Sequence, residues 1–291
     1  MKICFLVELP KGIWQWRDGL RAAMNILAEE HEVCYHLDGL LLEHKPDLLM
    51  AWGGSISPTT RQAREYEGKS LLFFAGGGIE TSFFDGIDLV LFENQLHTDE
   101  ARTKGIRCQT AFGTDTQTFK PIKQPKIFDV IYPAAFGLWK RKDLFARSVK
   151  GMKALTLGNI QQQEVECFDV CVDNGIAVSS DIPQEALPYF YNMSKICLIT
   201  TVPEIGGQRT ALEAMACGLP VVYTKDSVLV AELVNGHGIA VNPDPISIRQ
   251  VLMMLLNGYS KVSPIQLRDY VLQNYSEKQY ADKIRNAISQ C

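Results

Sequence analysis

Residues that can bind a phosphate group gather in the stretch 201–222 of the chain. An apolar run at 196–200 leads into it, a turn with Gly206 and Gly207 follows, and a helical pattern spans 207–216. The first turn of a helix presents unbonded backbone N–H groups and the positive end of the helix dipole, which together attract anions. The order strand, glycine turn and helix therefore predicts a diphosphate site.

The predicted helix carries Arg209, Thr210 and Glu213 on one face, because residues three and four apart are neighbours on a helix surface. Glu213 lies about one turn into the helix, where its carboxylate can accept hydrogen bonds from two hydroxyls of a ribose. Glu204, in the preceding loop, would then face the other end of the ligand. The alternative interpretation is a solvated Glu213 and an ordinary tight turn at the two glycines.

Three segments of the sequence resemble motifs of one enzyme family. Residues 204–222 (EIGGQRTALEAMACGLPVV) are similar to the donor-site signature of the retaining group 1 glycosyltransferases, family 4, which have the GT-B fold. Residues 113–121 (GTDTQTFKP) resemble the segment between the two domains of these enzymes. Residues 184–191 (QEALPYFY) resemble the helix before the strand that leads to the site. The resemblance covers residues 112 to about 257.

The resemblance implies a site for a nucleotide-diphosphate sugar donor. It implies that Glu213 binds the ribose and that Gly206 and Gly207 lie beside the diphosphate. It also implies that Glu204 contacts the transferred sugar as a catalytic residue. The donor-binding residues expected in this way are Glu213, Gly206, Gly207, Arg209 and Thr210.

The same resemblance implies two catalytic cations, Lys140 as partner of the departing diphosphate and Arg141 as its neighbour. A departing nucleoside diphosphate develops negative charge, which Lys, Arg and a helix N-terminus stabilise without a metal. The sequence has no Asp-x-Asp triplet, so a metal-bridged phosphate site has no support. We therefore expect a glycosyltransferase that retains anomeric configuration and uses neither a metal nor a cofactor.

The sequence departs from the family pattern at three places. Eight residues lie between Glu204 and Glu213, where the family usually has seven. The stretch 133–139 before Lys140 contains no Arg, although the family commonly has one there. Residues 75–78 (AGGG) stand where many members of the family have a His. An alternative is therefore a non-catalytic protein that binds a nucleotide sugar or a glycan on the same fold. A nucleotide-sugar epimerase is a third hypothesis, but it needs acid and base groups on both sides of the sugar, which the sequence does not identify.

Short apolar runs alternate with amphipathic segments along the chain, which is typical of βαβ units and parallel sheets. A proline-containing polar stretch at 112–127 interrupts the alternation and indicates a connector. We expect an α/β fold with two Rossmann-like doubly wound domains facing a cleft, as in the GT-B architecture. The first, 1–120, is the acceptor-side domain, and the second, 121–275, is the donor domain. The helix at 276–291 is expected to return to the first.

The loop after the first predicted strand contains Gly12 and Trp16. The resemblance implies that this loop contacts the acceptor or the phosphate. An aromatic ring there can stack on a sugar, but burial in the core of the first domain is the competing interpretation. The acceptor stays open as a glycan, a lipid or a small molecule.

Composition limits the partners and the compartment. The chain has 291 residues, 46% hydrophobic and 21% charged, with a net charge of −4. The longest basic run is Lys140 to Lys142, which argues against nucleic acid, and no apolar run approaches the roughly 18 residues of a membrane span. Eight cysteines without a CxxC pair, and a start that lacks a signal-peptide pattern, favour the reducing cytoplasm.

Overall fold

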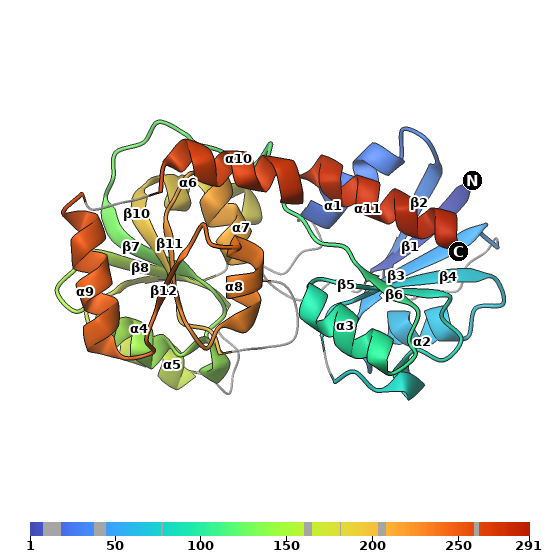
Figure 1. The fold of residues 1–291 in the computed structure, drawn as a ribbon, viewed down its shortest axis with the longest axis horizontal. Helices are drawn as coiled ribbons and strands as arrows, with labels where there is room; N and C mark the ends of the chain where they lie inside the picture. Colours follow the sequence, from blue (N-terminus) through green and yellow to red (C-terminus); the bar gives the residue numbers. More distant parts are fainter. Residues whose placement is uncertain are drawn as a thin grey trace. The chain divides into compact units, whose positions relative to one another are not determined.

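The computed structural model describes residues 1–7, 19–37, 45–76, 78–159, 165–180, 182–202, 208–258 and 262–291. The described residues form two compact units (Figure 1). The first takes its residues from 1–115 and 275–291, and the second from 116–202 and 208–274. Each unit has a six-stranded parallel sheet with helices on its faces, so the predicted α/β class with two Rossmann-like domains is confirmed.

The sheet of the first unit has the strand order β2-β1-β3-β4-β5-β6, and every pair is parallel. The order reverses between β1 and β3, which is the switch point where open α/β sheets bind ligands. All four residues of β5 are buried, which explains its continuous apolar run. The strands are β1 (Lys2–Val7), β2 (Glu32–Leu37), β3 (Leu48–Gly53), β4 (Lys69–Phe74), β5 (Leu89–Phe92) and β6 (Cys108–Thr110).

One face of this sheet is covered by two helices from distant parts of the chain, α1 and α11, which lie side by side (Figure 1). Leu20 and Met24 of α1 share one buried apolar cluster with Tyr280 and Ile284 of α11. Neither helix would bury its apolar stripe without the other. The helices of the first unit are α1 (Gly19–Leu27), α2 (Pro58–Arg64), α3 (Gln95–Thr103) and α11 (Glu277–Gln290), with the short 3-10 helix η1 (Thr81–Phe83).

The other face of the first sheet carries an aromatic cluster. Phe74, Phe84 and Phe92 are each at most 5% exposed. Their ring centroids lie 5.0, 5.6 and 5.9 Å apart, and the rings meet edge to face. Such pairs add to the stabilisation from burial alone, so this cluster is a rigid part of the core.

The chain leaves the first unit after Asp115 and returns to it at Tyr275. The two crossings lie together, because the backbone N–H of Thr114 donates to the carbonyl of Tyr275 at 2.8 Å. Thr114 also forms a parallel bridge with Ser276. The second unit is therefore an insertion into the first.

The sheet of the second unit has the order β12-β11-β10-β7-β8-β9, again with parallel pairs throughout. Its order reverses between β7 and β10, so the ligand-binding switch point lies at the carboxyl ends of these two strands. The strands are β7 (Phe128–Pro133), β8 (Ala154–Leu157), β9 (Ala177–Ser179), β10 (Ser194–Ile199), β11 (Val221–Thr224) and β12 (Ile239–Val241).

Helices cover the second sheet in two groups: α4 packs against α5 and α9, and α7 packs against α8 (Figure 1). Asp244 caps the N-terminus of α9 by accepting from the N–H of Ser247 at 2.8 Å. The helices are α4 (Lys142–Ser148), α5 (Val165–Asp173), α6 (Leu187–Asn192), α7 (Arg209–Ala216), α8 (Val228–Val234), α9 (Pro245–Leu256) and α10 (Pro264–Tyr275), with the 3-10 helices η2 (Leu138–Lys140) and η3 (Gln184–Ala186).

Helix α7 has a well-defined end. Gly218 adopts a φ of 78°, which only glycine tolerates without strain, and Leu219 N–H donates to the carbonyl of Ala214 at 2.9 Å. The guanidinium of Arg268, from α10, donates to the carbonyl of Ala216 at 2.8 Å. These contacts fix the helix and therefore the direction in which its first turn points.

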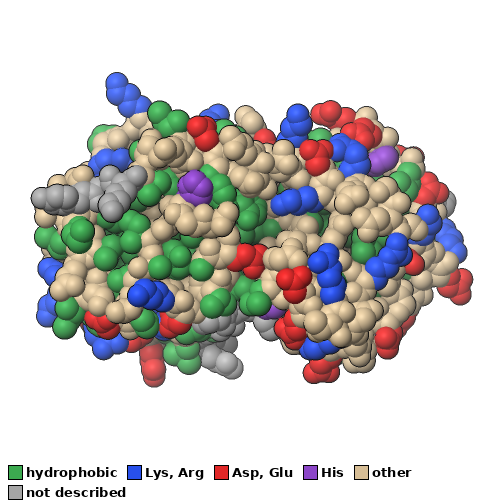
Figure 2. All heavy atoms as spheres, viewed as in Figure 1, with side chains coloured by type: hydrophobic (Ala, Val, Ile, Leu, Met, Phe, Trp, Pro, Cys, Tyr) green, Lys and Arg blue, Asp and Glu red, His purple; other side chains and the backbone are tan. Residues whose placement is uncertain are grey.

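Charged side chains of both signs are interspersed on the face of the molecule drawn in Figure 2. A mixed surface of this kind lacks the basic stripe that binds a nucleic acid backbone. Within the residues described, no helix has both the length and the apolar character needed to cross a membrane.

Candidate functional site

The switch point of the second sheet brings together four pieces of chain, which we call the switch edge: the carboxyl ends of β7, β10 and β11 and the first turn of α7. Thr210 Oγ1, in that first turn, donates to the carbonyl of Pro133 at the end of β7 over 2.7 Å. The N–H of Val202, beyond β10, donates to the carbonyl of Trp139 at 2.9 Å. The pieces are therefore hydrogen-bonded to one another, and the helix N-terminus faces an anion-binding position.

The loop after β7 is held against the end of β8. Ala134 N–H donates to the carbonyl of Leu157 at 2.8 Å, and Phe136 N–H donates to that of Asn159 at 2.9 Å. A Cβ at Gly158 would come within 2.0 Å of the Ala134 carbonyl oxygen. Glycine is thus required for the approach that fixes this loop.

Arg141 links three of the four pieces. Its guanidinium holds the Asp226 carboxylate with two bonds of 2.7 and 2.8 Å, and it donates to Thr224 Oγ1 at 2.6 Å. It also donates to the carbonyls of Thr200 and, at 3.3 Å, Thr201. The hydrogen bonds from Arg141 hold the pKa of Asp226 below its usual range. The guanidinium of the predicted catalytic residue Arg141 therefore forms hydrogen bonds within the protein, to residues at the ends of β10 and β11.

The two lysines beside Arg141 differ in their exposure to solvent. Lys140 is half-buried in η2, and its carbonyl accepts from Thr200 Oγ1 at 2.8 Å. Lys142 is completely buried, its Nζ lies 2.6 Å from Thr156 Oγ1, and it stands 4.1 Å above the ring of Tyr132. Burial lowers the pKa of Lys142 to about 7. Of the two lysines, only Lys140 is exposed enough to meet a ligand.

Glu213 is oriented by a buried tyrosine. Its side chain is 6% exposed, and Tyr191, from α6, donates its hydroxyl to Oε2 at 2.8 Å. Burial and the charge of Glu213 raise the pKa of Tyr191 well above its ordinary value, so the hydroxyl keeps its proton. Arg209 and Thr210, on the same face of α7, are half-buried. The alternative of a solvated Glu213 is thus excluded by its burial.

Five of the predicted site residues lie outside the described parts of the chain. Glu204, Gly206 and Gly207 fall in the stretch 203–207. The loop residues Gly12 and Trp16 fall in the stretch 8–18. Their roles stay predictions.

Comparison with known proteins identifies the domain that contains the switch edge. Residues 142–257 match the family model of the glycosyl transferases, group 1. The chain carries a group 1 glycosyltransferase domain. The predicted membership of group 1 and the predicted enzyme class, a glycosyltransferase, are thereby confirmed. No curated protein sequence matches the chain.

Solved glycosyltransferase-fold structures are similar to the chain over its whole length. Sucrose-phosphate synthase from Thermosynechococcus elongatus has a TM-score of 0.79 at 12% identity, covering 100% of this chain and 98% of its own. A glycosyltransferase from Rickettsia africae ESF-5 has 0.76 at 12%, covering 98% and 97%. HepE from Anabaena, solved with UDP and glucose, has 0.73 at 16%, covering 100% of both chains. At these identities the likeness establishes the GT-B fold.

Sequence reasoning missed three residues of the glycosyltransferase domain. Asp226, Tyr191 and Lys142 form contacts at the switch edge or below it. Tyr191 ends the motif 184–191, but the sequence did not show that its hydroxyl meets Glu213. Their partners lie between 10 and 85 residues away in the chain. The available signals were the segment 184–191, which ends at Tyr191, and the basic triplet 140–142, which ends at Lys142.

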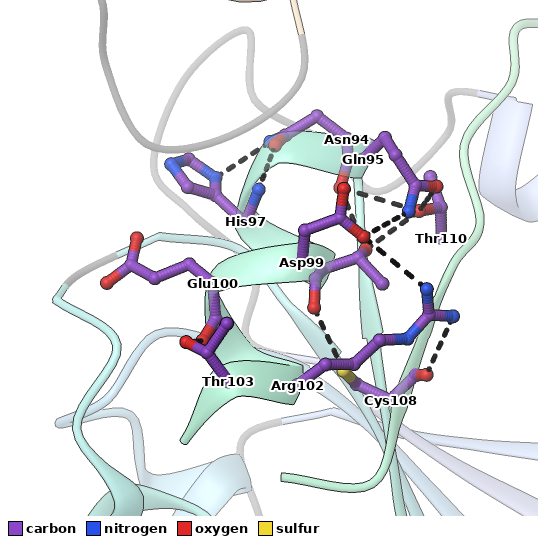
Figure 3. Close-up of polar contacts among 10 residues, drawn as sticks. Asn94, Gln95, His97, Asp99, Glu100, Arg102, Thr103, Cys108 and Thr110 are labelled. Carbon is purple, nitrogen blue, oxygen red and sulfur yellow. Dashed lines mark hydrogen bonds and ion pairs between the residues drawn. The ribbon is translucent and has the colours of Figure 1, made fainter. Parts of the chain in front are cut away.

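In the first unit, the helix α3 that follows the carboxyl end of β5 carries a histidine in its first turn. His97 lies in the first turn of α3, and its backbone N–H donates to Asn94 Oδ1 at 2.8 Å (Figure 3). That bond fixes the amide, so Asn94 Nδ2 faces His97 Nδ1 at 2.8 Å and must donate to it. The neutral ring therefore carries its proton on Nε2. Figure 3 shows the ring directed away from Arg102 and Thr110.

A small pocket also lies in the first unit, at the carboxyl ends of its strands. It is lined by Trp52 of β3, Phe74 of β4 and Glu93 after β5, with Gly113 after β6. Its free space of about 10 Å³ has room for roughly one water molecule, so the pocket is too small for a sugar.

Proposed function

We propose that the chain transfers a sugar from a nucleoside-diphosphate sugar to an acceptor hydroxyl, with retention of configuration and without a metal. The observation that carries this proposal is the buried carboxylate of Glu213, oriented by Tyr191 on the helix whose N-terminus faces the switch point. A carboxylate held in this way can accept both hydroxyls of a ribose, while the helix N-terminus binds the diphosphate. The group 1 family match includes both elements.

Lys140 and Arg141 divide the catalytic task between them in this proposal. Lys140 neutralises the charge that develops on the departing diphosphate. Arg141 is a positioning residue, because its bonds to Asp226 and Thr224 hold the loop that carries Lys140. Glu204 and Arg209 contact the sugar and the diphosphate, as the family resemblance implies.

The transfer takes place on one face of the sugar. The bond from the anomeric carbon to the diphosphate oxygen breaks, and the bond from that carbon to the acceptor oxygen forms. The acceptor hydroxyl gives its proton to the leaving diphosphate, so no carboxylate nucleophile is required. Exclusion of water from the site favours transfer over hydrolysis.

A uridine diphosphate donor is the first to test, because HepE, which shares the fold, was solved with UDP and with UDP-glucose. The acceptor is a glycan, a lipid or a small molecule. We assign the reaction to the cytoplasm, since all eight cysteines are free thiols.

The decisive experiment is a thermal-shift titration with UDP, GDP, ADP, CMP and dTDP. A ligand that binds only the folded protein raises the melting temperature by mass action. We expect one diphosphate to raise it for the wild type and not for Glu213→Ala. Glu166→Ala is the matched control, because Glu166 is an exposed carboxylate of the same unit.

Turnover separates the proposal from a binding protein. A donor that binds at Glu213 but is not consumed with any acceptor in a broad panel would support the non-catalytic alternative. Full donor affinity in Glu213→Ala would overturn the assignment of the ribose site.

A further inference from the structure

Two cysteines and a histidine converge on the outer strands of the first sheet. Cys4 of β1 and Cys34 of β2 are direct partners in the parallel register. His36 follows Cys34 by two residues, so its side chain lies on the same face of the sheet. The two Sγ atoms and a ring nitrogen of His36 all lie within 4.8 Å of one another.

The surroundings of this triad are apolar on the inside and open on the outside. Cys4 is 1% exposed and belongs to the buried cluster with Leu6 and Phe74, against which Cys34 packs. Cys34 and His36 are half-buried, because β2 is an edge strand of the sheet. A ligand can therefore reach the triad from the side of β2.

We propose that Cys4, Cys34 and His36 bind a zinc ion. Two thiolates and one neutral imidazole cancel the charge of a divalent cation, which suits a half-buried site next to an apolar cluster. Sulfur ligands disfavour Mg²⁺ and Ca²⁺, which prefer oxygen, and monovalent copper on the same ligands would leave a net negative charge. Three protein ligands leave a fourth tetrahedral position for water.

The geometry requires only a small adjustment. Ligand atoms about 2.0–2.3 Å from a tetrahedral zinc lie roughly 3.3–3.8 Å from one another. The triad must therefore contract by about 1 Å. Cys4 is fixed in the core, whereas the side chains of Cys34 and His36 on the edge strand have room to turn. The Sγ of Cys34 donates to the carbonyl of Ile3 at 3.5 Å, a weak bond that zinc binding replaces.

The consequence of the site is structural. Zinc would join the edge strand β2 to β1, adding coordinate bonds to a strand that has a single neighbour in the sheet. A metal that binds the folded chain stabilises it by mass action. None of the residues of the switch edge takes part, so the proposal is independent of metal-free sugar transfer.

Cobalt provides the spectroscopic test, since Co²⁺ occupies zinc sites and gives intense charge-transfer bands with thiolates. The reduced full-length protein is titrated with Co²⁺ and then with Zn²⁺. We expect thiolate bands that zinc removes, one zinc per chain by mass spectrometry, and a higher melting temperature with zinc. Cys34→Ser and His36→Gln should each lose about 100-fold in affinity or more.

Matched variants make the result specific to the triad. Cys291→Ser removes another half-buried cysteine of the same unit, and His31→Gln removes a histidine near the start of β2, so both should bind like the wild type. Circular dichroism checks that each variant folds. Equal binding by Cys34→Ser and wild type overturns the proposal, and so does a protein that takes up no metal or only forms a disulfide between Cys4 and Cys34.

Discussion

The two sheets have the same number of parallel strands, but different groups are buried around them. The first sheet is filled by apolar and aromatic side chains, of which Phe74, Phe84 and Phe92 form one cluster. The second has Lys142 and Glu213, the only charged side chains among the described residues that are less than 9% exposed. Both lie inside the segment that matches the glycosyltransferase family.

The buried charges of the second unit need partners. Taking a charge out of water costs free energy unless it is paired or hydrogen-bonded, so apolar residues would fill the same space at lower cost. The second unit nevertheless keeps charged groups at its switch edge and holds them with Thr156, Tyr191 and Asp226. Among the described residues, the charged side chains that are less than 9% exposed thus lie in the second unit, where neighbouring side chains hold them.

The largest expected effect comes from the aromatic cluster of the first unit. Phe74→Ala leaves a cavity between Phe84 and Phe92 and should lower the free energy of unfolding by about 3–5 kcal/mol. Denaturant unfolding measures this change, and the folded variant should bind UDP as the wild type does. Phe83→Ala, at a half-buried neighbour, should cost less. A tenfold loss of nucleotide affinity in Phe74→Ala would contradict the conclusion that this aromatic cluster serves stability and not nucleotide binding.

The next effect concerns the ion pair of the switch edge. Arg141→Met leaves Asp226 without its partner and should lower the free energy of unfolding by about 2–3 kcal/mol, less than for a fully buried pair because both groups are partly exposed. Arg147→Met is the control, since Arg147 pairs with Asp143 in an exposed i,i+4 bridge worth about 0.5 kcal/mol or less. Equal effects of the two substitutions would refute the role given to Arg141.

A pH dependence follows from the buried lysine. The pKa of Lys142 is about 7 in the fold and 10.5 in an ordinary environment, so the unfolded chain binds more protons between these values. The contribution of Lys142 to stability should therefore rise with pH above about 7, by at most about 1.4 kcal/mol per pH unit, and flatten below it. Lys142→Met should abolish this slope between about pH 7 and 9, and Lys150→Met, at an exposed site, should keep it. An unchanged slope in Lys142→Met would exclude the effect.

The smallest expected effect comes from the tyrosine hydroxyl that orients the carboxylate of Glu213. Tyr191→Phe keeps the ring that packs against Phe119 and removes only the hydroxyl that donates to Glu213. We expect stability to fall by about 1 kcal/mol and UDP affinity to fall about fivefold to tenfold. Tyr189→Phe, exposed on the same helix, should change neither. Calorimetric titration measures the affinity, and an unaltered value in Tyr191→Phe would remove the orienting role.

The strands and most helices were predictable from sequence, because strands buried on both faces give continuous apolar runs such as 89–92. The predicted helix 207–216 corresponds to α7 over its described part. The start of α4 was not predictable, since Arg141 takes a φ of 49° between η2 and α4. A left-handed arginine arises from tertiary bonds, not from local preference.

The sequence predicted which site residues share one face of α7, but it did not predict their hydrogen-bond partners. The i, i+4 spacing placed Glu213 on the face of Arg209, as the structure has it. Its burial was not predictable, because Tyr191 approaches from a helix 22 residues earlier. The Asp226 partner of Arg141 is 85 residues away. Only the fold of the sheet makes such pairs neighbours.

The insertion of the second unit into the first sets an order for biosynthesis. Helix α1 leaves the ribosome early, but α11, which covers its apolar side, is made only after residues 116–274. At about 5–20 residues per second, Leu20 and Met24 remain without that cover for roughly 13–50 s. The donor domain is therefore expected to fold first during translation, while the incomplete first unit is the part that a chaperone protects.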